Sequence, residues 1–470
     1  MPFAETTARL WEDEILPALT EYIAIPSLSP AFEPDWAAKG HMADAVELVR
    51  AWCAARPIDG LTVEVHELDG RTPVIVVEVP ASGAGGAADD TVLLYGHLDK
   101  QPPMTGWLDG LGPWTPVRRA ERLYGRGGAD DGYAAFASLA AIEAVRAEGA
   151  SHARCVLLIE ASEESGSPDL PAHVEALAPR LGSPSLVVCL DSGCATFDRL
   201  WATTSLRGLA GVTVTVRVLT EGVHSGAAGG MVPSSFRLLR QLLERVEDAR
   251  TGAVLLPELH AEIPPDRVAE LTATATELGN GGATFPFVSD VVASHAGDPA
   301  AQLLARTWRP ALAYIGADGL PPTGQAGNVL RPATTLGLSF RLPPTVDPKI
   351  ATDAIERALT ADPPQGAQVT IERDHAAAGW AAPAFAPWLE RALEEASRAA
   401  WGQPARTIGE GGSIPFMGML GERFPAAQFV VTGVLGPGTN AHGPNEYLHV
   451  PYATALTGAV AHLLAAHAGR

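Results

Sequence analysis

The hydrophobic pattern of the chain changes twice along its 470 residues. Up to about residue 204, short continuous apolar runs alternate with segments of helical composition such as 133–148. Strands that alternate with helices predict an α/β unit with a mixed, mostly parallel sheet. The Gly- and Ala-rich stretch 81–88 predicts a surface loop. The apolar runs are TPVIVVEV (72–79), TVLLYGHLD (91–99), CVLLIE (155–160) and SLVVCLD (185–191).

Residues 205–379 follow a different pattern. Apolar and polar residues alternate there in three segments, and two helical segments lie around 236–246 and 350–359. Strands of period two combined with two helices predict a small α+β layer. The α/β pattern returns in 380–470, so we expect one domain, 1–204 with 380–470, and a second domain, 205–379, inserted into it. The alternating segments are LAGVTVTVRVL (209–219), TTLGLSFRL (334–342) and QVTIER (368–373).

Charge and composition exclude several classes of protein. The net charge of -21 disfavours nucleic acid and anionic lipid as partners. No apolar run reaches the roughly 18 residues of a membrane span, and the N-terminal segment lacks the regions of a signal peptide. The cysteines form no CxxC pair and are expected to be reduced core residues. We therefore expect a cytoplasmic protein that acts on a small molecule. The cysteines are Cys53, Cys155, Cys189 and Cys194.

Potential metal ligands stand at the ends of the predicted strands and in one later loop. Taken singly, each has a structural alternative, such as a helix cap for Asp131 or a solvated loop position for a histidine. The carboxyl ends of strands in an open α/β sheet share one edge, so these groups can converge there. Two imidazoles and several carboxylates would suit a pair of zinc ions or similar divalent cations. The groups are His97 and Asp99 in YGHLDKQP, Asp130 and Asp131 in GRGGADDGY, Glu163 and Glu164 in EASEESGS, Asp191 in VVCLDSG, and His442 in GTNAHGPNE.

In order and chemistry these motifs resemble a family of di-zinc metallopeptidases. The family includes carnosinase-type dipeptidases, glutamate carboxypeptidases, aminoacylases and succinyl-diaminopimelate desuccinylase. The motifs are most similar to the cytosolic dipeptidase branch, and the resemblance covers nearly the whole chain. It implies that Asp130 bridges two metal ions. His97 and Asp191 would complete one metal site, and Glu164 and His442 the other.

The resemblance also assigns roles around these ligands. Asp99 would orient His97, and the peptide bond between Asp130 and Asp131 would be cis. Glu163 would be the general base, taking a proton from a water molecule and passing it to the leaving nitrogen. Two cations roughly 3.5 to 4 Å apart would lower the pKa of that water and polarise the scissile carbonyl. They would also offset the repulsion between the adjacent carboxylates of Glu163 and Glu164.

The inserted domain carries further matches. His224 in EGVHSGAAGG resembles a lid-loop histidine that reaches the active site of the partner subunit and stabilises the oxyanion, which implies a homodimer formed through this domain. Asn328 in AGNVLRP would help to bind substrate. Arg341 in LSFRLPP would bind a substrate carboxylate, with Gly412 and Ser413 of EGGSIP beside it. Without the resemblance, His224 is a loop histidine and Arg341 a surface charge at a strand end.

Two positions depart from the family pattern. Gly132 stands where many relatives have lysine, and Lys100 stands where many have a small apolar residue. We expect these changes to alter the charge near the cleft and the side-chain preference, but not the reaction. The expected reaction is metal-dependent hydrolysis of dipeptides or short peptides with a free C-terminal carboxylate. The alternatives are an N-acyl amino acid deacylase with the same metal site and, more remotely, a non-catalytic binding protein of the same fold.

Overall fold

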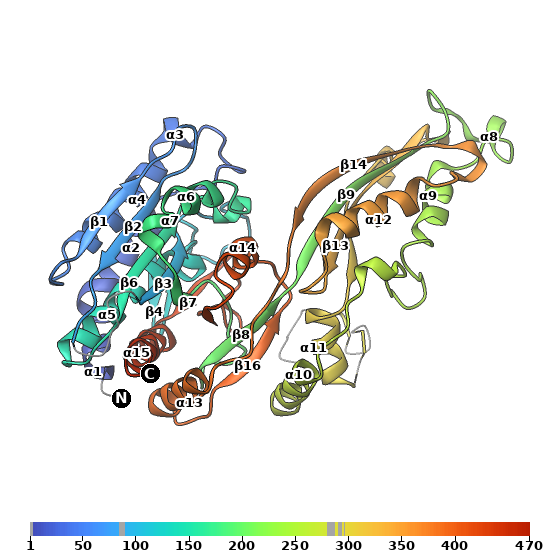
Figure 1. Ribbon diagram of the computed structural model, residues 1–470. Coiled ribbons are helices and arrows are strands. Elements are labelled where there is room, and N and C mark those ends of the chain that lie inside the picture. The colour runs from blue at the N-terminus through green and yellow to red at the C-terminus, as the bar shows by residue number, and fades with distance from the viewer. Residues whose placement is uncertain (1–2, 84–89, 280–286, 290–293, 296) are drawn as a thin grey trace. The chain divides into compact units, whose positions relative to one another are not determined.

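The computed structural model describes residues 3–83, 90–279, 287–289, 294–295 and 297–470, and the chain forms two compact units (Figure 1). The first unit comprises Met1–Thr204, Ala382–Ile408 and Met419–Arg470, and the second comprises Ser205–Ala381 and Gly409–Gly418. The units differ from the expected boundaries at 380–381 and at Gly409–Gly418, which the sequence placed in the first domain. The main-chain NH of Arg207 donates to Gly412 O at 3.1 Å, which ties this segment to the second unit. Most of the predicted loop 81–88 lies outside the described residues.

A mixed sheet forms the centre of the first unit. Its four middle strands, β6, β3, β7 and β17, run parallel, and antiparallel strands flank them. All residues of β3 are buried, as expected for a parallel strand covered on both faces. From β1 to β8 the sheet order is β1 (Thr62–His66), β2 (Val74–Val79), β6 (Arg154–Glu160), β3 (Thr91–His97), β7 (Pro184–Cys189), β17 (Gln428–Val431) and β8 (Trp201–Leu206), and β15 (Trp380–Ala381) and β16 (Arg406–Glu410) also pair with β8.

Helices pack around this sheet and form the rest of the core of the first unit. The alanine-rich helix α5 is buried along most of its length and packs against β3 and α15. Small side chains allow this close approach of helix to sheet and helix to helix. The helices are α1 (Ala4–Leu10), α2 (Leu16–Ala24), α4 (His41–Ala54), α5 (Tyr133–Ala147), α6 (Leu170–Ala176), α13 (Pro387–Trp401) and α15 (Val450–Ala468).

The second unit is an antiparallel sheet with helices on one face. Its strands lie in the order β11-β13-β9-β14, and residues of β13 alternate between buried and half-buried. The buried side chains pack against α9 and α12 in one apolar core. The expected fold class, a mixed α/β sheet with a separate α+β layer, is confirmed. The strands of this sheet and the helices that cover its core are β9 (Gly208–Arg217), α9 (Ser235–Leu243), β11 (Ala311–Asp318), β13 (Ala333–Leu342), α12 (Pro348–Thr360) and β14 (Gln368–Ala377).

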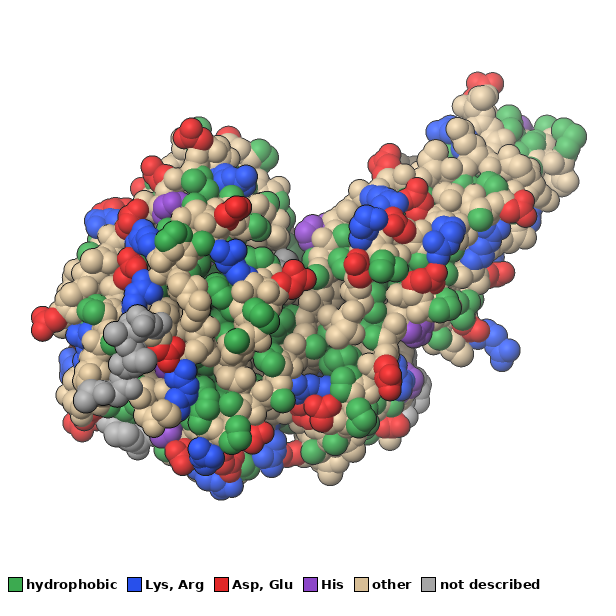
Figure 2. Space-filling view, viewed as in Figure 1, with side chains coloured by type: hydrophobic (Ala, Val, Ile, Leu, Met, Phe, Trp, Pro, Cys, Tyr) green, Lys and Arg blue, Asp and Glu red, His purple; other side chains and the backbone are tan. Residues whose placement is uncertain are grey.

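Other expectations from composition can be checked directly. All four cysteines are buried and none forms a disulfide, which confirms them as core residues. Among the described helices, none has the length and apolar character that a membrane crossing requires. On the face shown in Figure 2, acidic and basic side chains are interspersed, without a continuous basic patch.

Candidate metal centre

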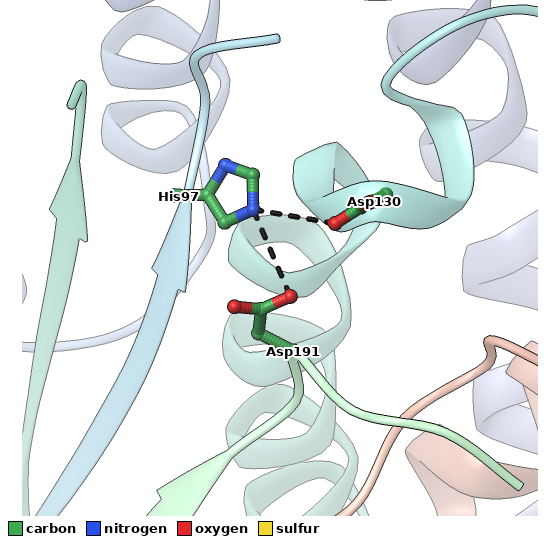
Figure 3. A group of neighbouring side chains, drawn as sticks. All are labelled: His97, Asp130 and Asp191. Carbon is green, nitrogen blue, oxygen red and sulfur yellow. Dashed lines mark ion pairs between the residues drawn. The ribbon is translucent and has the colours of Figure 1, made fainter. Parts of the chain in front are cut away.

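His97, Asp130 and Asp191 face one another at the carboxyl edge of the central sheet (Figure 3). His97 ends β3, Asp130 lies in the turn Gly128–Gly132 before α5, and Asp191 follows β7. His97 Nε2 lies 3.5 Å from Asp130 Oδ1 and 3.7 Å from Asp191 Oδ1. This nitrogen is buried and has no hydrogen-bond partner among the residues that the structure describes. Buried polar atoms normally have a partner, so a cation held between the three side chains fits the arrangement.

A second group of ligands shares Asp130 with the first. His442 Nε2 lies 2.9 Å from Asp130 Oδ2 and 3.4 Å from Glu164 Oε2. In each group of three, one ligand atom per residue lies within 4.8 Å of the others. Asp130 therefore presents Oδ1 to one group and Oδ2 to the other. Imidazole and carboxylate ligands in two such groups fit two divalent cations with Asp130 between them.

The carboxylate of Asp99 holds the paired glutamates. Its Oδ1 accepts from the NH of Glu163 at 3.0 Å, and its Oδ2 accepts from the NH of Glu164 at 3.0 Å. His97 Nδ1 lies 3.1 Å from the main-chain oxygen of Asp99 and 3.6 Å from its Oδ1. The main-chain carbonyl of Asp99 is therefore the nearer partner of His97. The carboxylate of Asp99 positions the turn Glu163–Ser165, a contact that the sequence did not predict.

The amide of Gln101 also supports this turn, and the sequence gave no role to it. Gln101 Nε2 donates to Glu164 Oε2 at 2.6 Å. The only indication of this role in the sequence is that Gln101 lies two residues after Asp99 in the motif YGHLDKQP.

The peptide bond between Asp130 and Asp131 is cis, as the resemblance implied. The side chain of Asp131 makes no capping hydrogen bond at the start of α5, so the structure does not support the helix-cap alternative.

A buried ion pair joins the loop of His442 to the turn that carries Asp130. Arg126 pairs with Glu446, and its Nη2 donates to Gly443 O at 2.9 Å. Glu446 Oε1 accepts from the NH of Gly127 at 2.9 Å. Both charged residues lie inside motifs already singled out, GRGGADDGY and GTNAHGPNE, but nothing in the sequence pairs them. The ion pair fixes two ligand-bearing loops that are about three hundred residues apart in the sequence.

The cluster raises the pKa values of three of its members, Glu163, Glu164 and His442. Burial, and then the charge of Asp191, raise the pKa of Glu163 well above its usual range. Burial and the charge of Asp130 raise the pKa of Glu164 to about 8. Burial lowers the pKa of His442, but its contact with Asp130 outweighs this and raises the value to about 9. Without a cation, Glu164 and His442 therefore hold protons at pH 7.

We expect metal binding to the metal-free protein to release protons at pH 7. Ligands bind a cation in their deprotonated form, and Glu164 and His442, with pKa values of about 8 and about 9, are still protonated at this pH. Raising the pH through 8 and 9 removes the competing protons, so the apparent affinity for zinc should rise from pH 6 to pH 9. Calorimetry in buffers of different ionisation enthalpy measures the release. Heats that do not depend on the buffer, with an affinity that does not change with pH, would contradict this expectation.

In the second unit, His224 and Asn328 lie close together, and Asn328 immediately precedes a strand that pairs with the strand of His224. His224 ends β10 (Val223–His224), which pairs with β12 (Val329–Leu330). The NH of Ser225 donates to Asn328 O at 2.8 Å, and both predicted residues are exposed.

Arg341 and Ser413 also come together in the second unit. Arg341 Nη1 donates to Ser413 Oγ at 3.2 Å, and Gly412 beside it is exposed. Arg207, which sequence reasoning missed, donates through Nε to Gly411 O at 3.1 Å. Burial and the neighbouring charges of Arg341 and Arg306 lower the pKa of Arg207 to about 10. Several guanidinium groups around one turn favour a negatively charged ligand.

Comparison with known proteins identifies the family. The chain matches peptidase family M20/M25/M40 over residues 93–466. It is 28% identical over 429 residues to cysteinylglycine-S-conjugate dipeptidase from Corynebacterium striatum, covering 88% of this chain and 90% of that protein. It is 27% identical to human Beta-Ala-His dipeptidase, covering 75% of this chain and 69% of that protein.

Solved structures agree with this assignment at the level of the fold. The structure of the dipeptidase Dug1p from Saccharomyces cerevisiae aligns with a TM-score of 0.78 and 21% identity, covering 100% of this chain and 98% of that one. The resemblance inferred from the sequence motifs is confirmed. The chain belongs to peptidase family M20/M25/M40 and is a metal-dependent hydrolase of its dipeptidase branch.

Proposed function

We propose that the protein uses two divalent metal ions, zinc in the first instance, to hydrolyse dipeptides with a free C-terminal carboxylate. The observation that carries this proposal is the pair of ligand groups that share Asp130. His97 and Asp191 would hold one cation with Asp130, and Glu164 and His442 would hold the other with it. The bound cations would polarise the scissile carbonyl and lower the pKa of a water molecule.

Glu163 is the proposed general base. It follows β6 in the short helical turn Glu163–Ser165, where Asp99 fixes its main-chain NH. Its raised pKa suits a carboxylate that takes up a proton and returns it to the leaving nitrogen. Glu164, its neighbour, is turned toward His442 and Gln101. The two adjacent carboxylates can therefore serve different purposes.

Substrate recognition is proposed from the charges of the second unit. Both relatives named above are dipeptidases, and every dipeptide ends in a carboxylate. Arg341, with Ser413 and Gly412, would bind this carboxylate, and Arg207 would add to the positive field. Asn328 would contact the substrate, and His224 would act on the partner subunit of a homodimer. An active monomer in sedimentation experiments would contradict this role of His224.

A substrate panel tests the proposal. It consists of Cys-Gly and β-Ala-His, their C-terminal amides, and N-acetyl and N-succinyl amino acids, each with zinc or manganese supplied. We expect cleavage of the dipeptides and about 100-fold lower kcat/KM for the amides, because a missing carboxylate leaves half-buried guanidinium groups without their partner. Each amide is a matched control, since it differs only in the terminal charge.

The panel also separates the alternative enzyme from the proposed one. Cleavage of the N-acyl amino acids alone would make the protein a deacylase and leave the metal site in place. Metal-bound protein that cleaves no member of the panel would contradict the dipeptidase proposal and favour a non-catalytic binding protein.

A further inference from the structure

We propose that Lys100 is a positioning residue for the metal centre, because its buried side chain fixes the segment 97–101 against the end of helix α2. The proposal rests on the proposed metal site and adds a residue to its support. Lys100 is 0% exposed, unlike a typical lysine. The sequence led us to expect its charge near the cleft, whereas the structure places the ammonium group inside the first unit.

The ammonium group binds the C-terminal end of α2. Nζ donates to Tyr22 O and to Ile25 O, each at 2.7 Å. It also lies 3.9 Å from the centre of the Tyr22 ring. Tyr22 O and Ile25 O also accept main-chain NH groups, from Ile25 at 3.1 Å and from Ser27 at 2.9 Å, so Lys100 adds a second donor at a helix end that carries a partial negative charge. Stacking on the aromatic ring adds a cation–π contact.

The segment anchored in this way supports both groups of metal ligands. His97 belongs to the first group, and Gln101 donates to Glu164 of the second. Between them, Asp99 accepts from the main chain of the paired glutamates. Leu98 O accepts from the hydroxyl of Tyr22 at 2.8 Å. A displacement of this short segment would therefore move ligands of both groups together.

The same lysine and tyrosine pack against the turn that carries Asp130. A Cβ atom at Gly127 would lie 2.5 Å from Lys100 Cε, and one at Gly132 would lie 2.0 Å from Tyr22 Cε1. Gly127 also has a φ of +81°, which disfavours a side chain there. Lys100 and Tyr22 thus occupy the space that side chains at these two glycines would need. This packing accounts for a glycine at 127, beside Lys100, and for a glycine at 132, beside Tyr22.

The residues that follow α2 connect Lys100 to the turn Glu163–Ser165. The NH of Ser29 donates to Lys100 O at 3.0 Å, and Ser29 Oγ lies 2.5 Å from Ser165 Oγ. The NH of Ala31 donates to Ser165 Oγ at 2.9 Å. The residues after α2 therefore contact both Lys100 and the end of the turn Glu163–Ser165. Because Lys100 binds the end of α2, it also helps to position the residues that contact Ser165.

The test compares Lys100→Met with a matched control, Val145→Ala. Methionine keeps the length of the side chain and removes its donor, while Val145 is a buried residue near the far end of α5 from Asp130. Both variants should be less stable to urea. We expect only Lys100→Met to bind zinc about 10- to 100-fold more weakly, the range typical for residues that support metal ligands. Its kcat at saturating zinc should fall more than its KM rises, and the visible spectrum of its cobalt form should shift.

The outcomes separate this inference from the proposed function. If the unaltered protein binds no zinc, the proposed metal site itself is wrong. If it binds zinc and folded Lys100→Met matches Val145→Ala in zinc affinity, cobalt spectrum and kcat, then Lys100 has only a structural role and the inference fails. If Lys100→Met does not fold, Lys100→Gln takes its place, since it keeps a polar side chain but removes the ammonium group that binds Tyr22 O and Ile25 O. Zinc affinity and a cobalt spectrum unchanged in Lys100→Gln would then overturn the inference.

Discussion

Replacing Glu163 with glutamine is expected to lower kcat by about 100- to 10,000-fold, the usual contribution of a general base. Glutamine keeps the shape of the side chain but cannot accept the proton. The main-chain NH of Glu163 would still bind Asp99, so the turn should stay in place. Metal content should therefore be unchanged, and KM should change little. Steady-state kinetics and metal analysis of the same preparation measure both quantities.

Glu164→Gln is the matched contrast for this experiment. It makes the same chemical change one residue later, at a side chain that lies against His442 and Asp130. This variant should lose metal as well as activity. If Glu163→Gln lost metal to the same extent, or kept more than a tenth of its kcat, the assignment of Glu163 as the base would be wrong.

The sequence anticipated the parts of the fold that depend on local pattern. The apolar runs at 72–79, 91–99, 155–160 and 185–191 correspond to β2, β3, β6 and β7. Polar residues after such runs could be placed at one edge of the sheet because parallel strands end there together. Strand direction and order were beyond this reasoning. β17, from the last part of the chain, lies between β7 and β8. The residues of an apolar run do not show which strand will pair with it.

The supporting contacts of the site could not be predicted for a related reason. The carboxylate of Asp99 binds main-chain NH groups, which every residue except proline offers, so no side-chain type marks them. The pairing of Arg126 with Glu446 joins loops that are distant in the sequence. Lys100 was expected to add charge near the cleft, but its side chain is buried against the end of α2. Metal ligands are recognisable by residue type, whereas the groups that hold them depend on tertiary structure.

Asp130 is the residue whose loss should have the largest effect on metal binding. It is the member common to both groups of ligands, and its pKa is held far below the usual range, against the effect of burial, by its contacts with His442 and His97. Asp130→Asn would leave each group with two ligands, fewer than the three protein ligands of a typical catalytic zinc site. We expect no bound zinc after gel filtration. The loss of kcat/KM should be about 1,000-fold or more, since bound cations contribute several kcal/mol to stabilisation of the transition state.

Asp191→Asn provides the graded control for that prediction. It removes a ligand from the first group alone and leaves Asp130, Glu164 and His442 together. Metal analysis should therefore find about two zinc ions per chain in the unaltered protein, about one in Asp191→Asn and none in Asp130→Asn. Circular dichroism would show that each variant is folded. Equal zinc content in the two variants would mean that Asp130 serves a single site, and the proposed bridge between the metals would have to be abandoned.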